Sequence, residues 1–364
     1  MRILYDGQIY AYQTAGGINR YFANVINRLP QDIYPTLTAQ YRRHKFQYPT
    51  HSNLTLKRYW GFRPRRVSDR VRAQYFRWIS SNSLFDIHHP TYYIRLTQDS
   101  FSQTRSPIVI TVYDMIHELF ADVVEPQGYT IRAKKDAVTA ADAILCLSEN
   151  TKADLLRYFP DAEAKTTVIY LASELSRSWA YGDEPVPSAP YFLYVGSRTK
   201  TYKNFDTLLM AFSKVASISP DILLSVVGEP FNDDEQVLIA ELKLADRIAH
   251  YQHASDTHLA KLYRCARAFV YPSLYEGFGI PLLEAMACGT VVVAANSSSI
   301  PEVVGDAGIL FEPKSVNDLA DILISLLSSA NNRDRLIAKG EKRARKFSWD
   351  ATAEKTVQVY RTLV

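Results

Sequence analysis

The sequence predicts an α/β protein of two domains, each a doubly wound parallel β-sheet with helices on both faces. Short apolar runs typical of fully buried strands alternate with amphipathic helical segments along the chain. A length of 364 residues suits two hydrophobic cores better than one. Residues 177–190 contain one glycine and three prolines, which is a linker composition, and we place the boundary there. The predicted domains are therefore residues 1–180 and 190–345.

In the first domain, a helix is expected over residues 18–29, because its apolar residues recur on one face. Gly16 and Gly17 precede this helix. Taken alone, the two glycines fit either a plain turn or a loop whose backbone closely approaches a ligand. The strands predicted in this domain cover residues 2–5, 84–88, 107–113, 143–147 and 168–171.

Polar residues follow several of these strands. His89 comes directly after the strand at 84–88, and Asp114 and His117 follow the strand at 107–113. The carboxyl ends of strands face the ligand crevice in doubly wound sheets, so these side chains are candidates for a site. A histidine beside an apolar strand is more often structural, and that alternative stays open for both histidines. Ser148 we interpret as a helix N-cap.

In the second domain, Arg198 and Lys203 follow the first strand, and Asn204 precedes an amphipathic helix that begins at Phe205. A turn followed by a helix explains Gly196 and Asn204, but it does not explain two cations at a strand end. The strands predicted here cover residues 191–195, 222–227, 248–251, 268–271 and 290–295. The helices predicted in the C-terminal part cover residues 319–327 and 331–364, the latter broken near residue 348.

The most informative stretch runs from Tyr271 to Pro313. It predicts a strand, a loop with Gly277 and Gly279, a short helix opened by Ile280, Pro281 and Leu282, and a second strand. Such a unit aims a helix N-terminus, with free backbone N–H groups, at the ligand crevice, where it can bind phosphate. Glu276 precedes this helix and Glu284 lies within it. Two close glycines alone would indicate only a tight turn.

The complete string is more specific. EGFGIPLLEAMACGTVVVA, followed by PEVVGDAGILFEP, resembles the donor-binding motif of retaining glycosyltransferases of family four. The resemblance covers nearly all of residues 190–364 and, more weakly, residues 1–180. It implies the GT-B architecture, two Rossmann-like domains that face a deep cleft. Residues 1–180 would be the acceptor-side domain, with helix 349–364 packing back on it, and residues 190–345 would bind the nucleotide-sugar donor.

The same resemblance implies roles for individual residues. Glu276 would face the hydroxyls of the transferred sugar, Glu284 would bind the ribose, and Arg198 and Lys203 would clamp the diphosphate. Tyr113 stands where the family usually has a histidine, so Tyr113, Asp114 or His117 would fill the N-domain catalytic position. Asp114 and His117 are the catalytic candidates, and His89 and Tyr113 are the acceptor candidates. The implied donor-binding set is Gly16, Gly17, Gly228, Tyr251, Gln252, His253, Gly277, Phe278, Gly279, Ile280, Pro281, Leu282 and Glu284.

The implied reaction moves a hexose from a nucleotide-diphosphate sugar to a hydroxyl of a sugar or lipid-linked acceptor, with retention, in polysaccharide biosynthesis. A UDP-sugar such as UDP-glucose is favoured as donor, and GDP-mannose comes next. The chain contains no Asp-x-Asp, so we expect no metal requirement and no other cofactor. A sugar-nucleotide epimerase and a non-catalytic nucleotide-sugar-binding protein are the alternatives; the first would need no acceptor, and the second would not need the cationic clamp.

Composition limits the cell compartment and the binding partners that we expect for this protein. The net charge is +4, and the three cysteines lie in apolar stretches, as expected for reduced thiols in a cytoplasmic protein. Charges within residues 1–6 argue against a secretory signal, and no uncharged apolar run approaches the ~18 residues of a membrane span.

Residues 41–80 differ from the rest, with eleven Lys or Arg, one acid (Asp69) and interleaved aromatics. The interpretations are a solvated loop or a peripheral contact with the anionic inner face of the cell membrane. Nucleic acid is not expected, since no recognition motif accompanies the charge.

Overall fold

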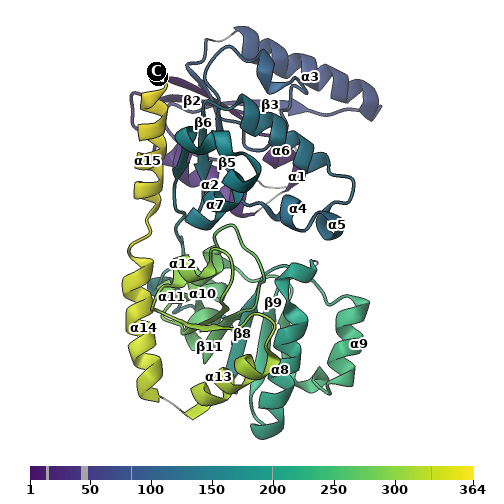
Figure 1. Ribbon diagram of the computed structural model, residues 1–364, viewed down its shortest axis with the longest axis vertical. Helices are drawn as coiled ribbons and strands as arrows, with labels where there is room; N and C mark the ends of the chain where they lie inside the picture. Colours follow the sequence, from purple (N-terminus) through teal and green to yellow (C-terminus); the bar gives the residue numbers. More distant parts are fainter. Residues whose placement is uncertain (14–15, 42–47, 83, 199, 329) are drawn as a thin grey trace. The chain divides into compact units, whose positions relative to one another are not determined.

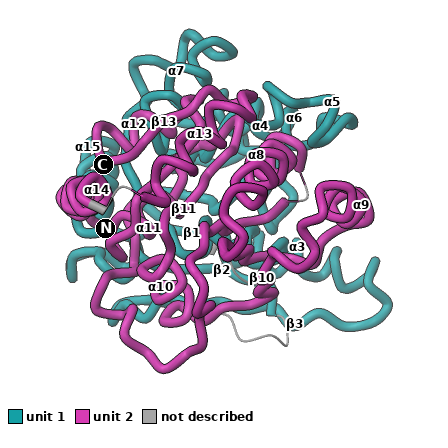
Figure 2. The backbone as a smooth tube through the Cα atoms, turned by 90° about the horizontal axis from the view of Figure 1, so that it is seen from below, with its two compact units in different colours: residues 1–171, 349–364 teal, residues 172–348 magenta. Residues whose placement is uncertain are grey.

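The computed structural model describes residues 1–364 except 14–15, 42–47, 83, 199 and 329. It divides into two compact units, unit 1 with residues 1–171 and 349–364 and unit 2 with residues 172–348 (Figure 2). The division at 171/172 falls a few residues before the proline-containing segment 177–190, which lies inside unit 2. No helix of the described residues is long and apolar enough to cross a membrane.

The strands of unit 1 form two parallel groups that meet at one point. The first has the order β3-β2-β1-β4 and the second β5-β6-β7, and a bridge from His88 to Ile108 joins β4 to the start of β5. This extends one parallel pattern across the unit, as the apolar strand runs predicted. The strands are β1 Arg2–Asp6, β2 Tyr34–Tyr41, β3 Thr55–Trp60, β4 Ile87–His88, β5 Val109–Val112, β6 Ala143–Cys146 and β7 Thr166–Val168.

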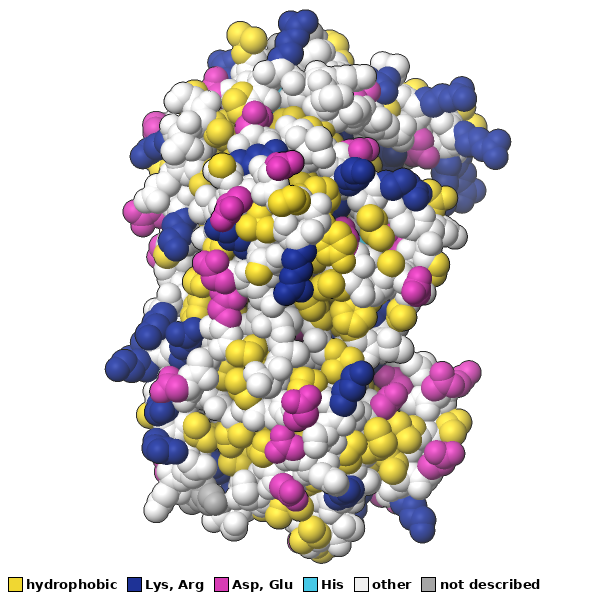
Figure 3. All heavy atoms as spheres, in the orientation of Figure 1, with side chains coloured by type: hydrophobic (Ala, Val, Ile, Leu, Met, Phe, Trp, Pro, Cys, Tyr) yellow, Lys and Arg dark blue, Asp and Glu magenta, His cyan; other side chains and the backbone are white. Residues whose placement is uncertain are grey.

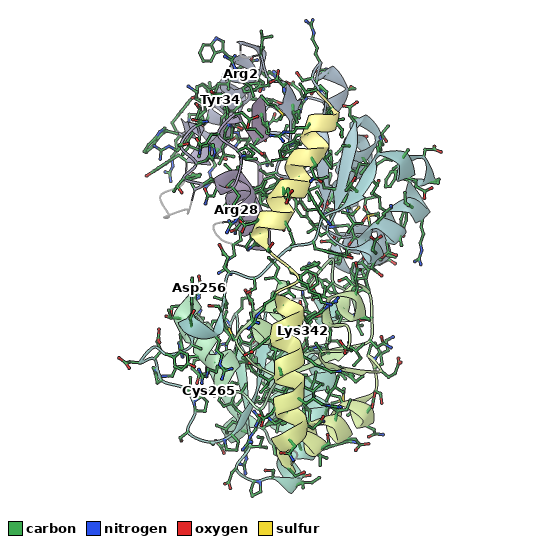
Figure 4. The ribbon with its side chains drawn as sticks, turned by 90° about the vertical axis from the view of Figure 1, so that its left-hand side faces the viewer. Arg2, Arg28, Tyr34, Asp256, Cys265 and Lys342 are labelled. Carbon is green, nitrogen blue, oxygen red and sulfur yellow. The ribbon has the colours of Figure 1, made fainter. Side chains whose placement is uncertain are left out.

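The last helix of the chain belongs to unit 1. It packs on α2, and its Asp350 forms an ion pair with Arg28 Nε at 2.8 Å (Figure 4). Buried hydroxyls fix it further, because Tyr360 on this helix contacts Tyr5 of β1 at 3.1 Å between the oxygens. The α-helices of unit 1 are α1 Ile9–Tyr12, α2 Gly17–Asn27, α3 Arg65–Asn82, α4 Ile116–Leu119, α5 Ala121–Val124, α6 Tyr129–Ala140, α7 Glu149–Tyr158 and α15 Trp349–Thr362.

Unit 2 contains a single parallel sheet with the order β10-β9-β8-β11-β12-β13 (Figure 1). In chain order this is 3-2-1-4-5-6, the order of a doubly wound dinucleotide-binding sheet. Residues of β11 and β12 are fully buried, which explains why these strands are apolar without alternation. The strands are β8 Tyr191–Val195, β9 Leu223–Val227, β10 Ile248–Tyr251, β11 Ala268–Tyr271, β12 Val292–Ala295 and β13 Ile309–Phe311.

Helices of unit 2 fall into two groups by their contacts. Helix α8 packs with α9 and α13, whereas α11 packs with α10, α12 and α14. The helices that follow β8 and β11 therefore belong to different groups, as expected when the winding direction reverses between these strands. The α-helices are α8 Phe205–Ile218, α9 Asp233–Glu241, α10 Asp256–Cys265, α11 Ile280–Ala287, α12 Ile300–Val304, α13 Val316–Ser328 and α14 Ala330–Ala344.

One cysteine departs from expectation. Cys146 and Cys288 are buried, as their apolar neighbours predicted, but Cys265 is exposed at the end of α10 (Figure 4). Its neighbours Leu262 and Tyr263 occupy the buried face of that helix, so the apolar sequence around Cys265 reflects their burial and not its own.

Candidate functional site

The candidate site in unit 2 lies where β8 and β11 end, side by side in the sheet. Reversal of the winding direction leaves this position as the usual ligand site of an open α/β sheet. The segment after β8 carries Lys203, and the loop after β11 carries Glu276. Their side chains form an ion pair, with 2.6 Å between Lys203 Nζ and Glu276 Oε1. The structure therefore brings together two residues to which the family resemblance gave roles at the donor.

Hydrogen bonds tie the two loops together at the backbone. Leu274 N donates to Tyr202 O at 2.7 Å. The Asn204 amide donates to Pro272 O and to Pro313 O, at 3.0 and 2.6 Å, so it links the loops that follow β11 and β13. Asn204 itself adopts φ +55°, a left-handed conformation that asparagine tolerates better than most residues. Its side chain makes no capping hydrogen bond to α8, although the position suggests a helix cap, and its amide instead positions the neighbouring loops.

Two serines hold the backbone of Glu276. Glu276 N donates to Ser298 Oγ at 2.9 Å, and Ser299 Oγ donates to Glu276 O at 2.8 Å and to Phe278 O at 3.1 Å. Burial, with the negative charge of Glu276 beside the phenol, raises the pKa of Tyr271. The Glu276 carboxylate is thus presented from a loop that is fixed on both sides of its Cα.

Helix α11 starts directly after this loop. Gly279 caps it at φ +97°, a conformation that L side chains rarely adopt, and a Cβ there would lie 2.9 Å from Leu282. Pro281 has no N–H, and Leu282 N already donates to Gly279 O at 3.0 Å. Of the four amides at 279–282, those of Gly279 and Ile280 are therefore the ones that can serve a phosphate.

Glu284 lies inside α11 and is buried. One of its carboxylate oxygens accepts a hydrogen bond from Tyr263 OH at 3.1 Å. Tyr263 belongs to α10, so Glu284 joins two helices of the same group. Glu276 and Glu284 thus occupy different environments, one beside a lysine and the other beside a tyrosine.

Arg198 has surroundings that the sequence did not indicate. Its side chain is 2% exposed, and Nε pairs with Glu235 Oε1 at 3.0 Å. Nη2 donates to Glu229 O, and the guanidinium lies 4.6 Å from the ring centre of Phe231. Nη1 is buried without a hydrogen-bond partner among the described residues. Arg198 is therefore held by protein groups, whereas Lys203 is the more accessible of the two cations.

Glu235 is not selected as a site residue from the sequence, because a glutamate three positions after Asn232 is explained by helix capping alone. Together with Asn232 it forms a capping box at the start of α9, with both hydrogen bonds at 2.9 Å. The same carboxylate also pairs with Arg198, 37 positions earlier. Only the tertiary structure shows the second role.

Residues of the implied donor-binding set at the carboxyl ends of β9 and β10 lie together. Gly228 N donates to Tyr251 O at 3.0 Å. A Cβ on Gly228 would lie 2.5 Å from Gly196 O and 3.0 Å from Arg198 Nη1, so only glycine fits. Gln252 and His253 follow on the surface.

In unit 1, His89 does not face a ligand. It is fully buried, its Nδ1 lies 2.6 Å from Tyr360 OH, and its Nε2 lies 2.8 Å from Thr111 Oγ1. Burial lowers the pKa of His89 to about 3, so the ring is neutral. Its predicted place among the acceptor contacts is wrong, because both nitrogens are engaged in the core. Tyr113 is also buried, and its OH donates to Thr91 O at 2.9 Å.

Asp114 and His117 remain together at the end of β5 and are partly exposed. Asp114 Oδ1 accepts from Ile116 N at 3.1 Å, and burial lowers the pKa of His117. Beneath them lies Lys134, a fully buried cation that the sequence analysis missed. It donates to Asp114 O at 2.9 Å and to Glu118 Oε2 at 2.7 Å.

Gly16 and Gly17 precede and open α2, after β1. Gly16 is extended, and a Cβ there would lie 2.7 Å from the Gln13 side chain. Asn19, one turn on, is 7% exposed, and neither its amide nitrogen nor its oxygen has a hydrogen-bond partner among the described residues. The choice between a ligand loop and a plain turn at Gly16 and Gly17 stays a prediction.

Two family models match the chain, "Glycosyltransferase Family 4" over residues 15–177 and "Glycosyl transferases group 1" over residues 183–343. The O-antigen chain mannosyltransferase B of Escherichia coli is 32% identical over 65% of this chain and 64% of that protein. The MMP alpha-(1->4)-mannosyltransferase of Mycolicibacterium hassiacum is 38% identical over 46% of this chain and 41% of that protein. The chain thus spans less than two thirds of the length of either relative.

Solved structures share the fold. The sucrose-phosphate synthase of Thermosynechococcus elongatus aligns with a TM-score of 0.80 at 22% identity, over 100% of this chain and 98% of that one. WaaG, described as a glycosyltransferase involved in lipopolysaccharide biosynthesis, aligns with a TM-score of 0.71 at 15% identity, over 99% of both chains. The structural neighbours are GT-B glycosyltransferases, and the two units of this chain share their fold, each with parallel strands.

Proposed function

Since this chain belongs to glycosyltransferase family 4, we propose that it transfers a hexosyl group from a nucleotide-diphosphate sugar to a hydroxyl of a sugar or lipid-linked acceptor. The observation that carries this proposal is the Lys203–Glu276 pair at the β8/β11 switch point, beside the start of α11. The cation and the free backbone N–H groups there suit the diphosphate oxygens, and the carboxylate suits the sugar hydroxyls.

The chemistry requires stabilisation of a departing diphosphate. When the anomeric C–O bond breaks, negative charge increases on the diphosphate oxygens, and fixed donors at those oxygens lower the barrier. Lys203 Nζ and the N–H groups of Gly279 and Ile280 are the groups we assign to this task. A bound diphosphate would compete with Glu276 for Lys203 and so release the carboxylate to accept hydrogen bonds from the sugar hydroxyls.

Arg198 has an indirect part in this proposal. Its buried pair with Glu235 keeps a positive charge close to Gly228, behind the strand-end loop. Because Glu235 balances that charge, we assign Arg198 to supporting the loop at Gly228 and Glu229 and not to attracting the diphosphate. Lys203 is then the cation that contacts the diphosphate directly.

We propose retention of the anomeric configuration, with the leaving phosphate taking the acceptor proton, and no metal requirement. Family membership supports both points, and Lys203, the cation assigned above, supplies the charge that a metal would otherwise provide. Asp114 and His117 at the end of β5 are the residues proposed to meet the acceptor hydroxyl.

For the donor, the names of the relatives shift the preference. Sequence resemblance favoured a UDP-sugar, but the two relatives compared above are named as mannosyltransferases. We therefore propose a mannosyl group, with GDP-mannose as the first donor to test and UDP-glucose as the second. The pathway we propose is synthesis of a polysaccharide or a related glycan, on an acceptor that a membrane lipid carries.

The test is release of nucleotide diphosphate by the purified chain, measured for each donor with and without acceptor sugars. The proposal expects release that rises when an acceptor is added and a new glycosidic product of retained configuration. Free sugar formed at the same rate without acceptor would instead indicate a sugar-nucleotide epimerase. Binding of donor without release of diphosphate in any mixture would indicate a non-catalytic nucleotide-sugar-binding protein.

A further inference from the structure

The end of β3 and the outer face of α3 present large apolar residues to solvent. We call this the α3 surface; it consists of Trp60, Phe62, Arg63, Arg65, Arg66, Val67, Arg70, Val71, Gln74 and Trp78. Trp60 is 60% exposed and Trp78 is 63% exposed, and Phe62, Val67 and Val71 are also exposed. Exposed tryptophans in such a group mark a contact surface more often than scattered single apolar residues do.

The opposite face of α3 packs in the protein core, so the helix does not need the exposed apolar residues for its attachment. Phe76 and Ile79 are buried in a cluster with Tyr59 and Leu96. On the outer face, residues 67, 71, 74 and 78 recur at helical spacing and form one stripe. The stripe contributes nothing to that buried cluster, so its apolar side chains are available to another surface.

A basic stripe runs beside the apolar one. Arg66 and Arg70 lie one position before Val67 and Val71, and Arg63 and Arg65 lie at the helix start. In the described part of the chain none of these four arginines has an acidic partner, whereas Arg72 and Arg77 on the inner side pair with Asp69 and Asp99. Lys and Arg side chains gather around α3 at the upper right of Figure 3. Residues 42–47 of this basic segment lie outside the described residues.

We propose that the α3 surface binds an anionic lipid bilayer, with the tryptophans and valines in the interfacial layer and the four arginines on the lipid phosphates. The combination of exposed tryptophans, exposed valines and arginines that pair with no acid among the described residues identifies the partner. Tryptophan favours the membrane interface, and each basic residue near an anionic leaflet adds a favourable interaction. Nucleic acid would bind the arginines through its phosphates and stack its bases on the aromatic rings, but it would not gain from contact with the two exposed valines. This inference extends the proposed function by bringing the enzyme to a lipid-carried acceptor, and it is measured independently of sugar transfer.

The test is co-sedimentation of the full chain with vesicles, without donor or acceptor. Vesicles of equal parts phosphatidylglycerol and phosphatidylcholine are expected to bind the chain, and vesicles of phosphatidylcholine alone are expected to bind it weakly. Binding should fall as salt rises from about 0.1 M to about 1 M, because screening shortens the reach of the charges. Binding to both kinds of vesicle alike, or to neither, would overturn the inference, and so would binding to RNA in the absence of binding to vesicles.

Matched variants locate the contact. Arg66→Gln with Arg70→Gln should lower the partition coefficient by about 25-fold, or about 5-fold for each charge. The control, Lys342→Gln with Lys346→Gln, removes two exposed cations at the same spacing from α14 and its end, and it should bind like the wild type (Lys342 is labelled in Figure 4). Trp78→Ala should weaken binding and reduce the blue shift of tryptophan fluorescence on vesicle addition, to which Trp60 still contributes. Equal losses in the α3 and α14 pairs would show a response to net charge and reject the α3 surface.

Failure of this inference and failure of the proposed function are distinguishable. Transfer to a soluble acceptor should be unchanged in the Arg66 and Arg70 variant, since neither residue belongs to the site at the ends of β8, β11 or β5. Loss of vesicle binding with intact transfer therefore confirms the surface, and intact vesicle binding with no transfer rejects only the enzymatic proposal.

Discussion

Lys203 and Glu276 lie 73 positions apart in the sequence, and their side chains meet at 2.6 Å where β8 and β11 end. Each comes from a loop that hydrogen bonds hold in place, so the pair does not depend on two freely rotating side chains. The ion pair neutralises the site in the absence of donor. In the proposed mechanism, arrival of a diphosphate would exchange one anionic partner of Lys203 for another, which would keep the cost of donor binding low.

Replacement of Lys203 tests the diphosphate contact. Lys203→Ala should lower turnover by about 10²–10³-fold, because a donor to the developing negative charge is lost. Some loss of stability is also expected, since the Lys203 and Glu276 side chains are only 18% and 11% exposed, but the fold should persist. Steady-state assays with circular dichroism check this, and Lys214→Ala, on the exposed face of α8, is the control. Turnover within a few-fold of the wild type would reject the assigned contact.

The two glutamates of unit 2 should respond differently. Glu276→Gln keeps the shape but weakens the acceptor for sugar hydroxyls, so turnover should fall. Affinity for the free nucleotide diphosphate should not fall, because the variant no longer competes with the diphosphate for Lys203. Glu284→Gln should mainly weaken that affinity, because Glu284 is proposed to bind the ribose. Calorimetric titration of each variant with the nucleotide diphosphate separates the two effects. Equal losses of affinity in both would contradict the division of roles.

Arg198 should matter for stability as well as activity. Arg198→Met leaves Glu235 buried without its partner, which should lower the free energy of unfolding by about 3–5 kcal/mol. Arg335→Met, on the exposed surface of α14, should change it by less than about 0.5 kcal/mol. Denaturant titrations give both values. A variant at Arg198 with unchanged stability would show that the Arg198–Glu235 pair contributes nothing net.

His89 predicts a pH dependence of stability. Its folded pKa is about 3, below the ordinary value of about 6.5, so the unfolded chain binds more protons between these values. Stability should therefore fall as pH falls through this window, by about 2 kcal/mol from this residue at about pH 5. Burial raises the pKa of Asp6 to about 7, so Asp6 increases stability as pH falls. This contribution is the same in the wild type and in His89→Asn. His89→Asn should show a shallower fall than the wild type between about pH 7 and pH 5, and equal slopes would contradict the burial of a neutral ring.

Metal independence is a separate prediction. With Lys203 and backbone N–H groups serving the diphosphate, transfer should survive an excess of EDTA. The measurement is diphosphate release before and after chelation. A loss that magnesium or manganese restores would require a metal at the diphosphate and would reduce the part assigned to Lys203.

Comparison of sequence and structure shows which features local patterns can predict. The strand, glycine loop and helix around Glu276 were predictable, because apolar runs, Gly279 and Pro281 act on the chain within a few residues. The surroundings of His89 and Arg198 were not, because their partners lie 271 positions away at Tyr360 and 37 positions away at Glu235. The local sequence around a histidine at a strand end does not show whether its side chain contacts a ligand or a buried tyrosine.

The α3 helix illustrates an intermediate case. Composition showed that residues 41–80 are basic and aromatic, but it could not separate a solvated loop from a structured surface. The fold resolves this for residues 65–82, because burial of Phe76 and Ile79 fixes which face of α3 points outward. Helical periodicity alone does not determine that choice when apolar residues occur on both faces.

The most direct test of the donor site is a crystal structure of the chain with a bound nucleotide diphosphate. We predict that the diphosphate lies within hydrogen-bond distance of Lys203 Nζ and of the N–H groups of Gly279 and Ile280, with the ribose at Glu284 and the base near Gly228 and Tyr251. A nucleotide bound elsewhere, with the Lys203–Glu276 pair unchanged and the start of α11 vacant, would contradict it.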